Sequence, residues 1–238
     1  MAQSDQDANR LWQAFSALRL AEGNLNDRLD LPNVLSLVPP GQNARALDLG
    51  CGLGQASFQL AERLGYQVTA VDNNELLLSQ ARKLYRGAKI EWVFSDFDVL
   101  PFAPGTFKVI ISCLAFHFIR NLDDVISSCA KWLETGGRLI FSVRHPIRTS
   151  DPVGELHGET NVSWIVSNYS AEGLREFHWL EHPCVNYHRT FSTYLQMLRS
   201  SGLQIENVRE SSVHDQHDAI AMESRSVPFF LTISAKRE

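Results

Sequence analysis

Three glycines alternate with other residues in the segment Asp48-Leu49-Gly50-Cys51-Gly52-Leu53-Gly54. This segment follows a short apolar run and precedes a run with helical spacing, so we expect it to form the turn between a strand and a helix. Glycines suit such a turn because the backbone can bend sharply and approach a ligand where a Cβ would obstruct it. The dinucleotide-binding fingerprint requires a glycine at position 55, where this chain has Gln55. A pyrophosphate cradle is therefore the weaker interpretation.

Acidic residues close the next two predicted strands. Asp72 lies 18 residues beyond Gly54, close to the spacing of about 20 at which an acid meets ribose hydroxyls in βαβ nucleoside sites. Asp96 and Phe97 follow the third predicted strand, where a carboxylate can accept from an adenine amino group and a phenyl ring can flank the base. Any one of these acids alone is also a common helix cap. Three consecutive strand ends of this kind favour a nucleoside-containing ligand.

The elements that must position these residues follow an alternating pattern from Ala44 onward, which predicts βαβ units around a parallel sheet. Strands are expected at 44–49, 67–72, 90–96, 107–113 and 138–143, and helices at 55–64, 75–86 and 122–134. A helix over 190–201 and strands at 203–210 and 228–235 follow, while helical spacing over 11–20 predicts a helix before the sheet. Between 144 and 189 the periodicity is lost.

The chain resembles the class I S-adenosylmethionine-dependent methyltransferases over about residues 44–146. The resemblance is carried, in the family's order, by the segments ALDLGCGLG, VDNNELLLSQAR, FSDFDVLPF, FKVIISCLAFHFI and LETGGRLIFSVRHP. It implies an α/β fold, namely a Rossmann-like, doubly wound seven-stranded sheet with one antiparallel strand, PFFLTISA, and an insertion or lid after the fifth strand. A looser similarity, through SVRHP and NYHRTFSTYLQML, is to small-molecule enzymes of the generic bacterial methyltransferase domain family.

The resemblance also implies S-adenosyl-L-methionine as cofactor and S-adenosyl-L-homocysteine as product. The glycine loop would hold the methionine end, Asp72 the ribose, and Asp96 with Phe97 the adenine. The residues expected to bind the cofactor are Asp48, Gly50, Cys51, Gly52, Gly54, Asp72, Asn73, Asp96, Phe97, Ser112 and Leu114. The expected organisation is a single domain over 1–238: a lead-in at 1–43, a cofactor-binding core at 44–143, a lid insertion at 144–189, and a C-terminal helix and strands at 190–238.

Histidines near strand ends are the candidates for a catalytic base. Methyl transfer mainly requires that the acceptor is positioned and water excluded, and a base helps only where the acceptor carries a proton of high pKa. His145 is the first choice because it follows a strand end and precedes Pro146, which restricts the local backbone. His117 and His188 are the other candidates. Each ring could instead cap a loop.

Aromatic residues in the lid are candidates for the acceptor pocket. Tyr169, Trp179 and Tyr187, together with Trp164, could line it, although a lid needs such residues for its own small core. Arg189 could bind an acceptor carboxylate through two parallel hydrogen bonds or bind the lid backbone. The predicted reaction is methylation of oxygen or nitrogen in a small-molecule acceptor.

Composition and charge limit the kinds of molecule that we expect the protein to bind. The chain has 238 residues and a net charge of −5, with no long basic run that could follow a phosphate backbone, so we expect no nucleic-acid partner. No apolar run is long enough to span a membrane and the first residues do not resemble a secretory signal, which predicts a cytoplasmic protein. The 4 cysteines form no CxxC pair, and we expect no metal site, even at His182, Cys184 and His188.

Three alternative functions remain open on the sequence. A catalytically silent S-adenosylmethionine-binding subunit would keep the same glycine loop. A nucleic-acid methyltransferase would place an Asp/Asn-Pro-Pro-aromatic run after the fourth strand, where this chain reads Ser112-Cys113-Leu114-Ala115-Phe116. An NAD-dependent oxidoreductase would require the missing third glycine at position 55.

Overall fold

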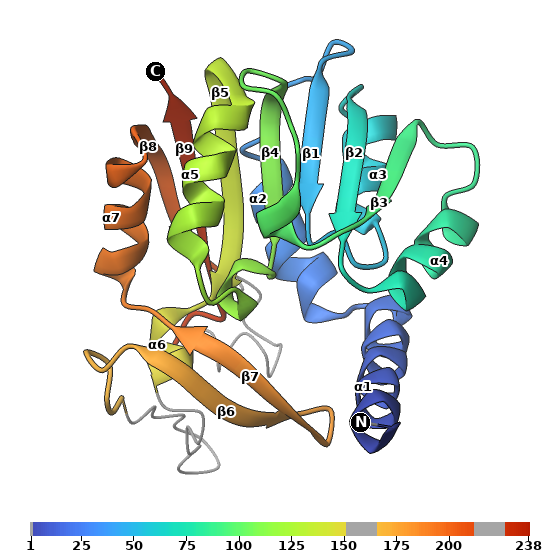
Figure 1. The fold of residues 1–238 in the computed structure, drawn as a ribbon, viewed down its shortest axis with the longest axis vertical. Coiled ribbons are helices and arrows are strands. Elements are labelled where there is room, and N and C mark those ends of the chain that lie inside the picture. The colour runs from blue at the N-terminus through green and yellow to red at the C-terminus, as the bar shows by residue number, and fades with distance from the viewer. Residues whose placement is uncertain (1, 151–165, 212–226) are drawn as a thin grey trace.

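The protein folds around a seven-stranded sheet in the order β3-β2-β1-β4-β5-β9-β8 (Figure 1). The computed structural model describes residues 2–150, 166–211 and 227–238. The first five strands run parallel and β9 runs antiparallel to both of its neighbours, as predicted. The strands are β1 (Arg45–Leu49), β2 (Gln67–Asp72), β3 (Ile90–Phe94), β4 (Phe107–Cys113), β5 (Leu133–Arg144), β8 (Leu203–Glu210) and β9 (Phe230–Arg237).

Helices cover both faces of the sheet, which is why the central strands are apolar on both sides. One face packs against α2 (Leu31–Leu35), α3 (Gln55–Glu62) and α4 (Glu75–Leu84), and the other against α5 (Leu122–Trp132) and α7 (Phe191–Ser200). Val34, Leu60 and Leu78 are fully or almost fully buried on the first face, as are Ile126 and Leu198 on the second. The two apolar layers cover the faces of the sheet and do not extend over the carboxyl ends of its strands.

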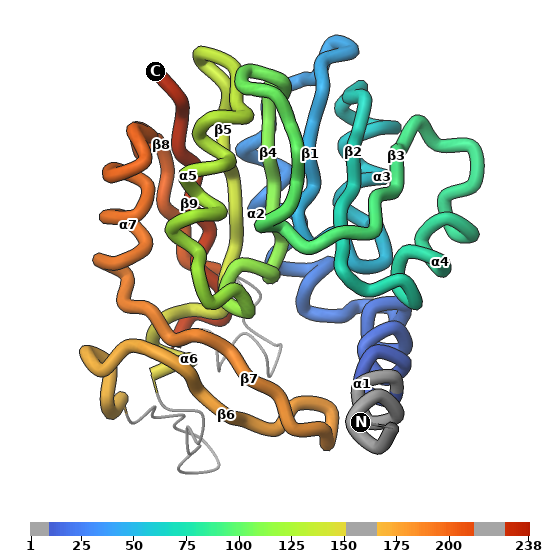
Figure 2. The backbone as a smooth tube through the Cα atoms, in the orientation of Figure 1, coloured from blue at the N-terminus to red at the C-terminus, as the bar shows by residue number. Residues whose placement is uncertain are grey.

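The remaining elements lie at the carboxyl ends of the parallel strands. They are α1 (Ala2–Leu20), α6 (Pro146–Ser150) and a hairpin of β6 (Gly173–Trp179) and β7 (His182–His188). Figure 2 shows the hairpin extending below the sheet toward α1. The two elements meet where the rings of Phe15 and Trp179 pack with centroids 5.6 Å apart. The hairpin and α1 therefore lie over the carboxyl ends of the strands, where the sequence places the candidate site residues.

The hairpin is formed by two regular strands, although the sequence there shows no periodic pattern of apolar residues. Its turn residues Leu180 and Glu181 both have positive φ, 50° and 65°, a conformation normally signalled by Asn-Gly or Asp-Gly. Leu174 and Val185 are also exposed while Arg175 faces inward, so polarity does not follow the strand alternation. The predicted lid at 144–189 thus contains α6 and this hairpin, and 151–165, with Trp164, lies outside the described residues. Its role as a lid stays a prediction.

The fifth strand is longer than predicted. The sequence places a helix to Glu134 closed by two glycines, whereas α5 ends at Trp132 and β5 begins at Leu133, which pairs with Phe107. Gly136 adopts a φ of 79° within an irregular stretch, and regular pairing resumes at Arg138. The glycine accommodates a bulge inside the strand instead of a helix end.

Candidate active site

The glycine loop between β1 and α3 is packed closely on two sides. Gly50 and Gly54 have φ of 78° and 84°. A Cβ on Gly50 would lie 2.4 Å from the Cβ of Ala115, and one on Gly54 would lie 2.4 Å from the Trp92 ring. The Trp92 ring in turn stacks near Tyr85, with centroids 6.5 Å apart. The loop therefore needs glycine at these two positions both for its turn and for its close packing.

Asp72, at the end of β2, binds the backbone of the glycine loop. Its Oδ2 accepts from the Gly52 N–H at 2.8 Å and its Oδ1 accepts from the Asn74 N–H at 2.9 Å. Burial raises the pKa of this carboxyl, and these N–H groups partly offset the effect. Each carboxylate oxygen has a second lone pair, so the group can also accept from two ligand hydroxyls.

Asp48, at the loop's start, is fully buried. Its Oδ2 accepts from the Ser57 hydroxyl at 2.5 Å, while its Oδ1 has no hydrogen-bond partner among the described residues. Burial raises the pKa of Asp48 to about 7, the negative charge of Asp72 adds to the shift, and Ser57 opposes it. Buried carboxylate oxygens seldom lack a partner, so Asp48 Oδ1 is a candidate to accept a hydrogen bond from a ligand at the start of the loop.

The ends of β2 and β3 meet through their side chains. The Asn73 amide donates to Asp96 Oδ1 at 2.8 Å, and both groups are exposed. The Phe97 ring lies close to the glycine loop, since a Cβ on Gly50 would be 3.4 Å from it. The structure thus brings the glycine loop, Asp72 and the Asp96-Phe97 pair to one edge of the sheet. Their chemistry suits a ligand that carries a ribose and an adenine, such as S-adenosylmethionine.

The end of β4 continues this edge. Ser112 is buried and donates to the Leu49 carbonyl at 2.8 Å, which ties β4 to the start of the loop. Leu114 has a φ of 53°, and its N–H points to both the carbonyl and the hydroxyl of Ser142, each 3.1 Å away. Burial raises the pKa of Cys51 well above its usual value. The Cys51 thiol is neutral and serves as a small packed residue.

Asp30 also reaches this region, beside Ser142, although its place in the sequence does not indicate a site residue. It is 1% exposed and its Oδ1 has no partner within the described part of the chain. Burial raises the pKa of Asp30 to about 7, opposed by the Ser142 hydroxyl and the charge of Arg19. In the sequence it resembles an N-cap before Pro32, yet its side chain makes no capping hydrogen bond. That distinction requires the structure.

The three candidate histidines differ in what their rings contact. His145 donates from Nε2 to Glu210 at 2.8 Å, and its Nδ1 accepts from the Ile147 N–H at 3.2 Å. His188 donates from Nε2 to the Tyr169 carbonyl at 2.8 Å, and its Nδ1 lies 2.8 Å from the Thr149 hydroxyl. Burial lowers the pKa of both rings. Both are neutral rings with each nitrogen already engaged, an arrangement that favours positioning over proton transfer.

His117 is different. It lies in the turn after β4, is 2% exposed, and its Nδ1 has no partner in the described ranges. Burial lowers the pKa of His117 well below its usual value, and the positive charges of Arg144 and Arg189 lower it further. Of the three predicted histidines, this one keeps a free ring nitrogen in a neutral ring.

The predicted acceptor residues lie in and around the hairpin. Arg189 is buried and donates to the carbonyls of Ile119 and Arg120, at 2.6 and 2.8 Å, which is the backbone-binding alternative of the sequence analysis. Tyr169 accepts from the Phe191 N–H at 3.0 Å, so its hydroxyl supports the start of α7. The rings of Trp179 and Tyr187 face Phe15 and the Arg189 guanidinium respectively.

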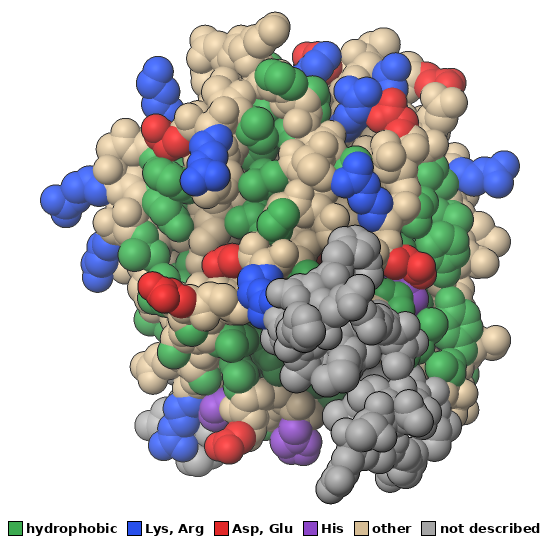
Figure 3. Space-filling view, turned by 180° about the vertical axis from the view of Figure 1, so that it is seen from behind, with side chains coloured by type: hydrophobic (Ala, Val, Ile, Leu, Met, Phe, Trp, Pro, Cys, Tyr) green, Lys and Arg blue, Asp and Glu red, His purple; other side chains and the backbone are tan. Residues whose placement is uncertain are grey.

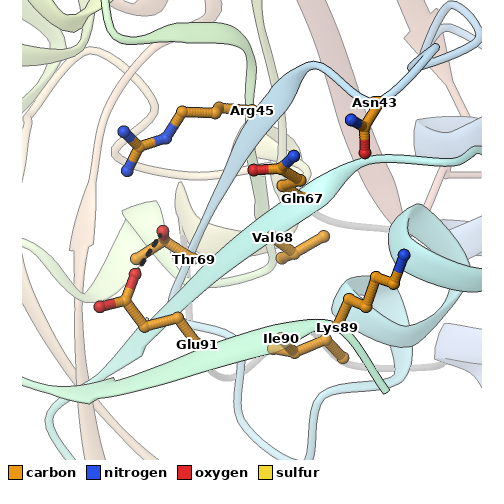
Figure 4. Close-up of a pocket in the computed structure, with 8 residues that line it drawn as sticks. All are labelled: Asn43, Arg45, Gln67, Val68, Thr69, Lys89, Ile90 and Glu91. Atoms are coloured by element: carbon orange, nitrogen blue, oxygen red, sulfur yellow. Dashed lines mark hydrogen bonds between the residues drawn. The ribbon is translucent and has the colours of Figure 1, made fainter.

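A surface hollow of about 510 Å³ lies at the other end of the sheet (Figure 4). It is lined by the amino ends of β1, β2 and β3, and in it the Thr69 hydroxyl donates to Glu91 at 3.1 Å. It is separated from the glycine loop by the length of the strands. On the face drawn in Figure 3, acidic and basic side chains are interspersed, without a continuous basic surface over the described residues.

None of the helices in the described part of the chain is long and apolar enough to cross a membrane. No group of three or more His, Cys, Asp or Glu side chains within 2–150, 166–211 and 227–238 is placed to hold a metal ion.

Comparison with known proteins agrees with this geometry. A family model described as a methyltransferase domain matches residues 47–141. A Haemophilus influenzae protein of uncharacterized function is 33% identical, covering 88% of this chain and 87% of its own length. A ubiquinone biosynthesis O-methyltransferase from Xanthomonas euvesicatoria is 26% identical, covering 81% of this chain and 76% of its own.

A solved structure is similar over nearly the whole molecule. The crystal structure of an S-adenosylmethionine-dependent methyltransferase from Mesorhizobium loti matches with a TM-score of 0.79 and 30% identity, covering 87% of this chain and 96% of that one. A TM-score of this size shows that the two chains share one fold. The chain belongs to the class I S-adenosylmethionine-dependent methyltransferases.

Proposed function

We propose that the enzyme transfers the methyl group of S-adenosylmethionine to an oxygen or nitrogen of a small-molecule acceptor, and that His117 takes the acceptor's proton. The observation that carries the proposal is the buried, neutral His117 ring with its free Nδ1. It follows β4, next to the end of β5, where Leu114 and Ser142 are joined. The similarity to an O-methyltransferase of ubiquinone biosynthesis supports oxygen as the acceptor atom.

Different residues at the sheet edge bind different parts of the cofactor. We infer that Asp72 binds the ribose, that Asp96 and Phe97 hold the adenine, and that the glycine loop with Asp48 holds the methionine end. Bound there, the cofactor supplies a methyl group on a positively charged sulfur, which is open to in-line attack. The protein then has to align the acceptor and keep water out.

The elements below the sheet edge exclude water and hold the acceptor. The Phe15 ring of α1, which packs against Trp179 of the hairpin, lies over the glycine loop, because a Cβ on Gly52 would be 3.8 Å from it. His117 stays unprotonated at neutral pH because burial and two arginines lower its pKa. Its unprotonated Nδ1 is the atom that would receive the acceptor's proton as the acceptor atom bonds to the methyl group.

Calorimetric titration tests cofactor binding first. S-adenosylmethionine and S-adenosylhomocysteine should bind with micromolar affinity, and NAD should not. Binding of NAD alone would contradict the assignment of the glycine loop and the function with it.

A methylation screen then tests the reaction. The protein is incubated with deuteromethyl-labelled S-adenosylmethionine and pools of phenols, carboxylic acids and amines, and labelled products are sought by mass spectrometry. His117→Gln should lower turnover of the labelled acceptor by roughly 10²–10⁴ without weakening S-adenosylhomocysteine binding. The matched control is His178→Gln, because His178 lies on the exposed side of β6. Equal activity of the two variants would remove His117 from the proposal.

A further inference from the structure

We propose that the methyl acceptor carries an anionic oxygen group, a carboxylate or a phosphate, and that Arg144 at the end of β5 binds it. The inference rests on the proposed function, since it names the substrate class of the same site. Three observations carry it: the guanidinium of Arg144 has no ion-pair partner among the described residues, other arginines lie near it, and the neighbouring hairpin holds a buried amide oxygen without a partner in the described ranges.

Arg144 is a partly buried cation without an anionic partner among the residues that the structure describes. Its guanidinium carbon lies 4.8 Å from the centre of the Phe177 ring, and it makes no hydrogen bond or ion pair with any described residue. Burial lowers the pKa of Arg144 to about 10, so the group is still charged at neutral pH. A buried charge without a partner is unfavourable, whereas an arginine lying over an aromatic ring can keep its N–H groups free for a bidentate anion.

The surroundings of Arg144 add positive charge. Arg148 lowers the pKa of Arg144, and Arg144 and Arg189 both lower that of His117. The hydrogen bonds of Arg189 go to the carbonyls of Ile119 and Arg120, which are neutral. The described groups next to His117 thus favour an anionic ligand, and the ligand's charge would be held close to the proposed base.

The inner face of the hairpin supplies the independent observation. Phe177 and Cys184 are cross-strand partners, and both lie near Arg144. Asn186 is two residues farther along β7 on the same inward side, is 2% exposed, and has no partner for its Oδ1 among the described residues. A buried amide oxygen without a donor is rare. It can accept from a hydroxyl or amine of the same acceptor.

Arg144 therefore takes the carboxylate-binding role that was one of the two alternatives for Arg189. Both are arginines near strand ends, but Arg189 donates to backbone carbonyls, whereas the N–H groups of Arg144 donate to no residue in 2–150, 166–211 or 227–238. The position of Arg144 fits as well, because it lies two residues beyond Ser142, whose carbonyl and hydroxyl face the Leu114 N–H. Ser142 and Arg144 point to the same side of the strand.

Probe anions test the proposal without knowledge of the natural acceptor. The full chain, saturated with S-adenosylhomocysteine, is titrated with benzoate and phenyl phosphate, and with benzamide as the neutral counterpart, at constant ionic strength. The readout is the ring-nitrogen resonances of His117, followed over pH. At least one anion should bind roughly tenfold or more tightly than benzamide and raise the pKa of His117, because it neutralises Arg144. The two anions distinguish a carboxylate from a phosphate site.

Substitutions at Arg144 test whether this residue binds the anion. Arg144→Gln should weaken anion binding roughly tenfold or more and raise the pKa of His117 without any ligand, and Arg144→Lys should restore the charge effect but not the full affinity. Arg199→Gln, on the exposed side of α7, is the control and should leave both unchanged. Failure of both anions to bind, or undiminished binding by Arg144→Gln, overturns the proposal. S-adenosylhomocysteine binding in the same samples separates this failure from failure of the proposed function.

Discussion

Replacing Asp48 by Asn should change how the protein's stability depends on pH. Burial raises the pKa of Asp48 from 3.8 to about 7, so the folded protein holds a proton that the unfolded chain releases. The stability that this proton contributes is complete below pH 3.8 and is lost as the pH rises through about 7. At about 1.4 kcal/mol per pKa unit, the loss between pH 5 and pH 8 is about 2–3 kcal/mol.

The measurement is urea denaturation of the unliganded protein at several pH values between 5 and 8. Asn keeps the acceptor for Ser57 but places amide protons at the unpartnered position, which adds a cost that does not vary with pH. The test is therefore the difference between wild type and Asp48→Asn, which should shift in favour of the variant by about 2–3 kcal/mol over this range. Asp98→Asn, at an exposed position, should show no such trend. Parallel curves for wild type and Asp48→Asn would refute the assignment of a buried, protonated carboxyl.

Three further outcomes follow from described contacts. Asp72→Ala should weaken S-adenosylhomocysteine binding by about 2–4 kcal/mol in calorimetry, through lost charge-assisted hydrogen bonds, and unchanged affinity would remove Asp72 from the site. Gly54→Ala should cost about 2–4 kcal/mol in urea denaturation, because its Cβ would lie 2.4 Å from Trp92 at a φ of 84°. Trp179→Ala should speed amide exchange in α1 roughly 2–10-fold, since the contact with Phe15 is lost; exchange confined to the hairpin would contradict that coupling.

The sequence predicts the sheet well because its signals are local. The strands at 67–72, 107–113 and 203–210 have the expected bounds, since each is a strand-like apolar run bounded by polar or turn residues. The hairpin escapes prediction because Leu180 and Glu181 form a turn that these residue types rarely adopt. Its tertiary contacts, not its local propensity, decide the conformation.

Some residues of the candidate site can likewise be predicted from the sequence and others cannot. The glycine loop and strand-end acids can be located from spacing along the chain. Arg144 differs from Arg189, and His117 from His145, in the groups that pack against each side chain. The spacing of residues along the sequence does not contain that information. Asp30 shows the same limit, because its burial depends on packing against β5, more than 100 positions away in the sequence.

The position of β9 has a consequence for how the chain folds. This strand is the last in sequence, yet it lies between β5 and β8 and is almost entirely buried. The pair Leu139 and Ala235 joins residues 96 positions apart. Such distant pairing slows folding, because a long loop must close before the contacts form. Until β9 inserts, β5 presents an open apolar edge, and the nascent sheet is exposed to pairing with other chains during that interval.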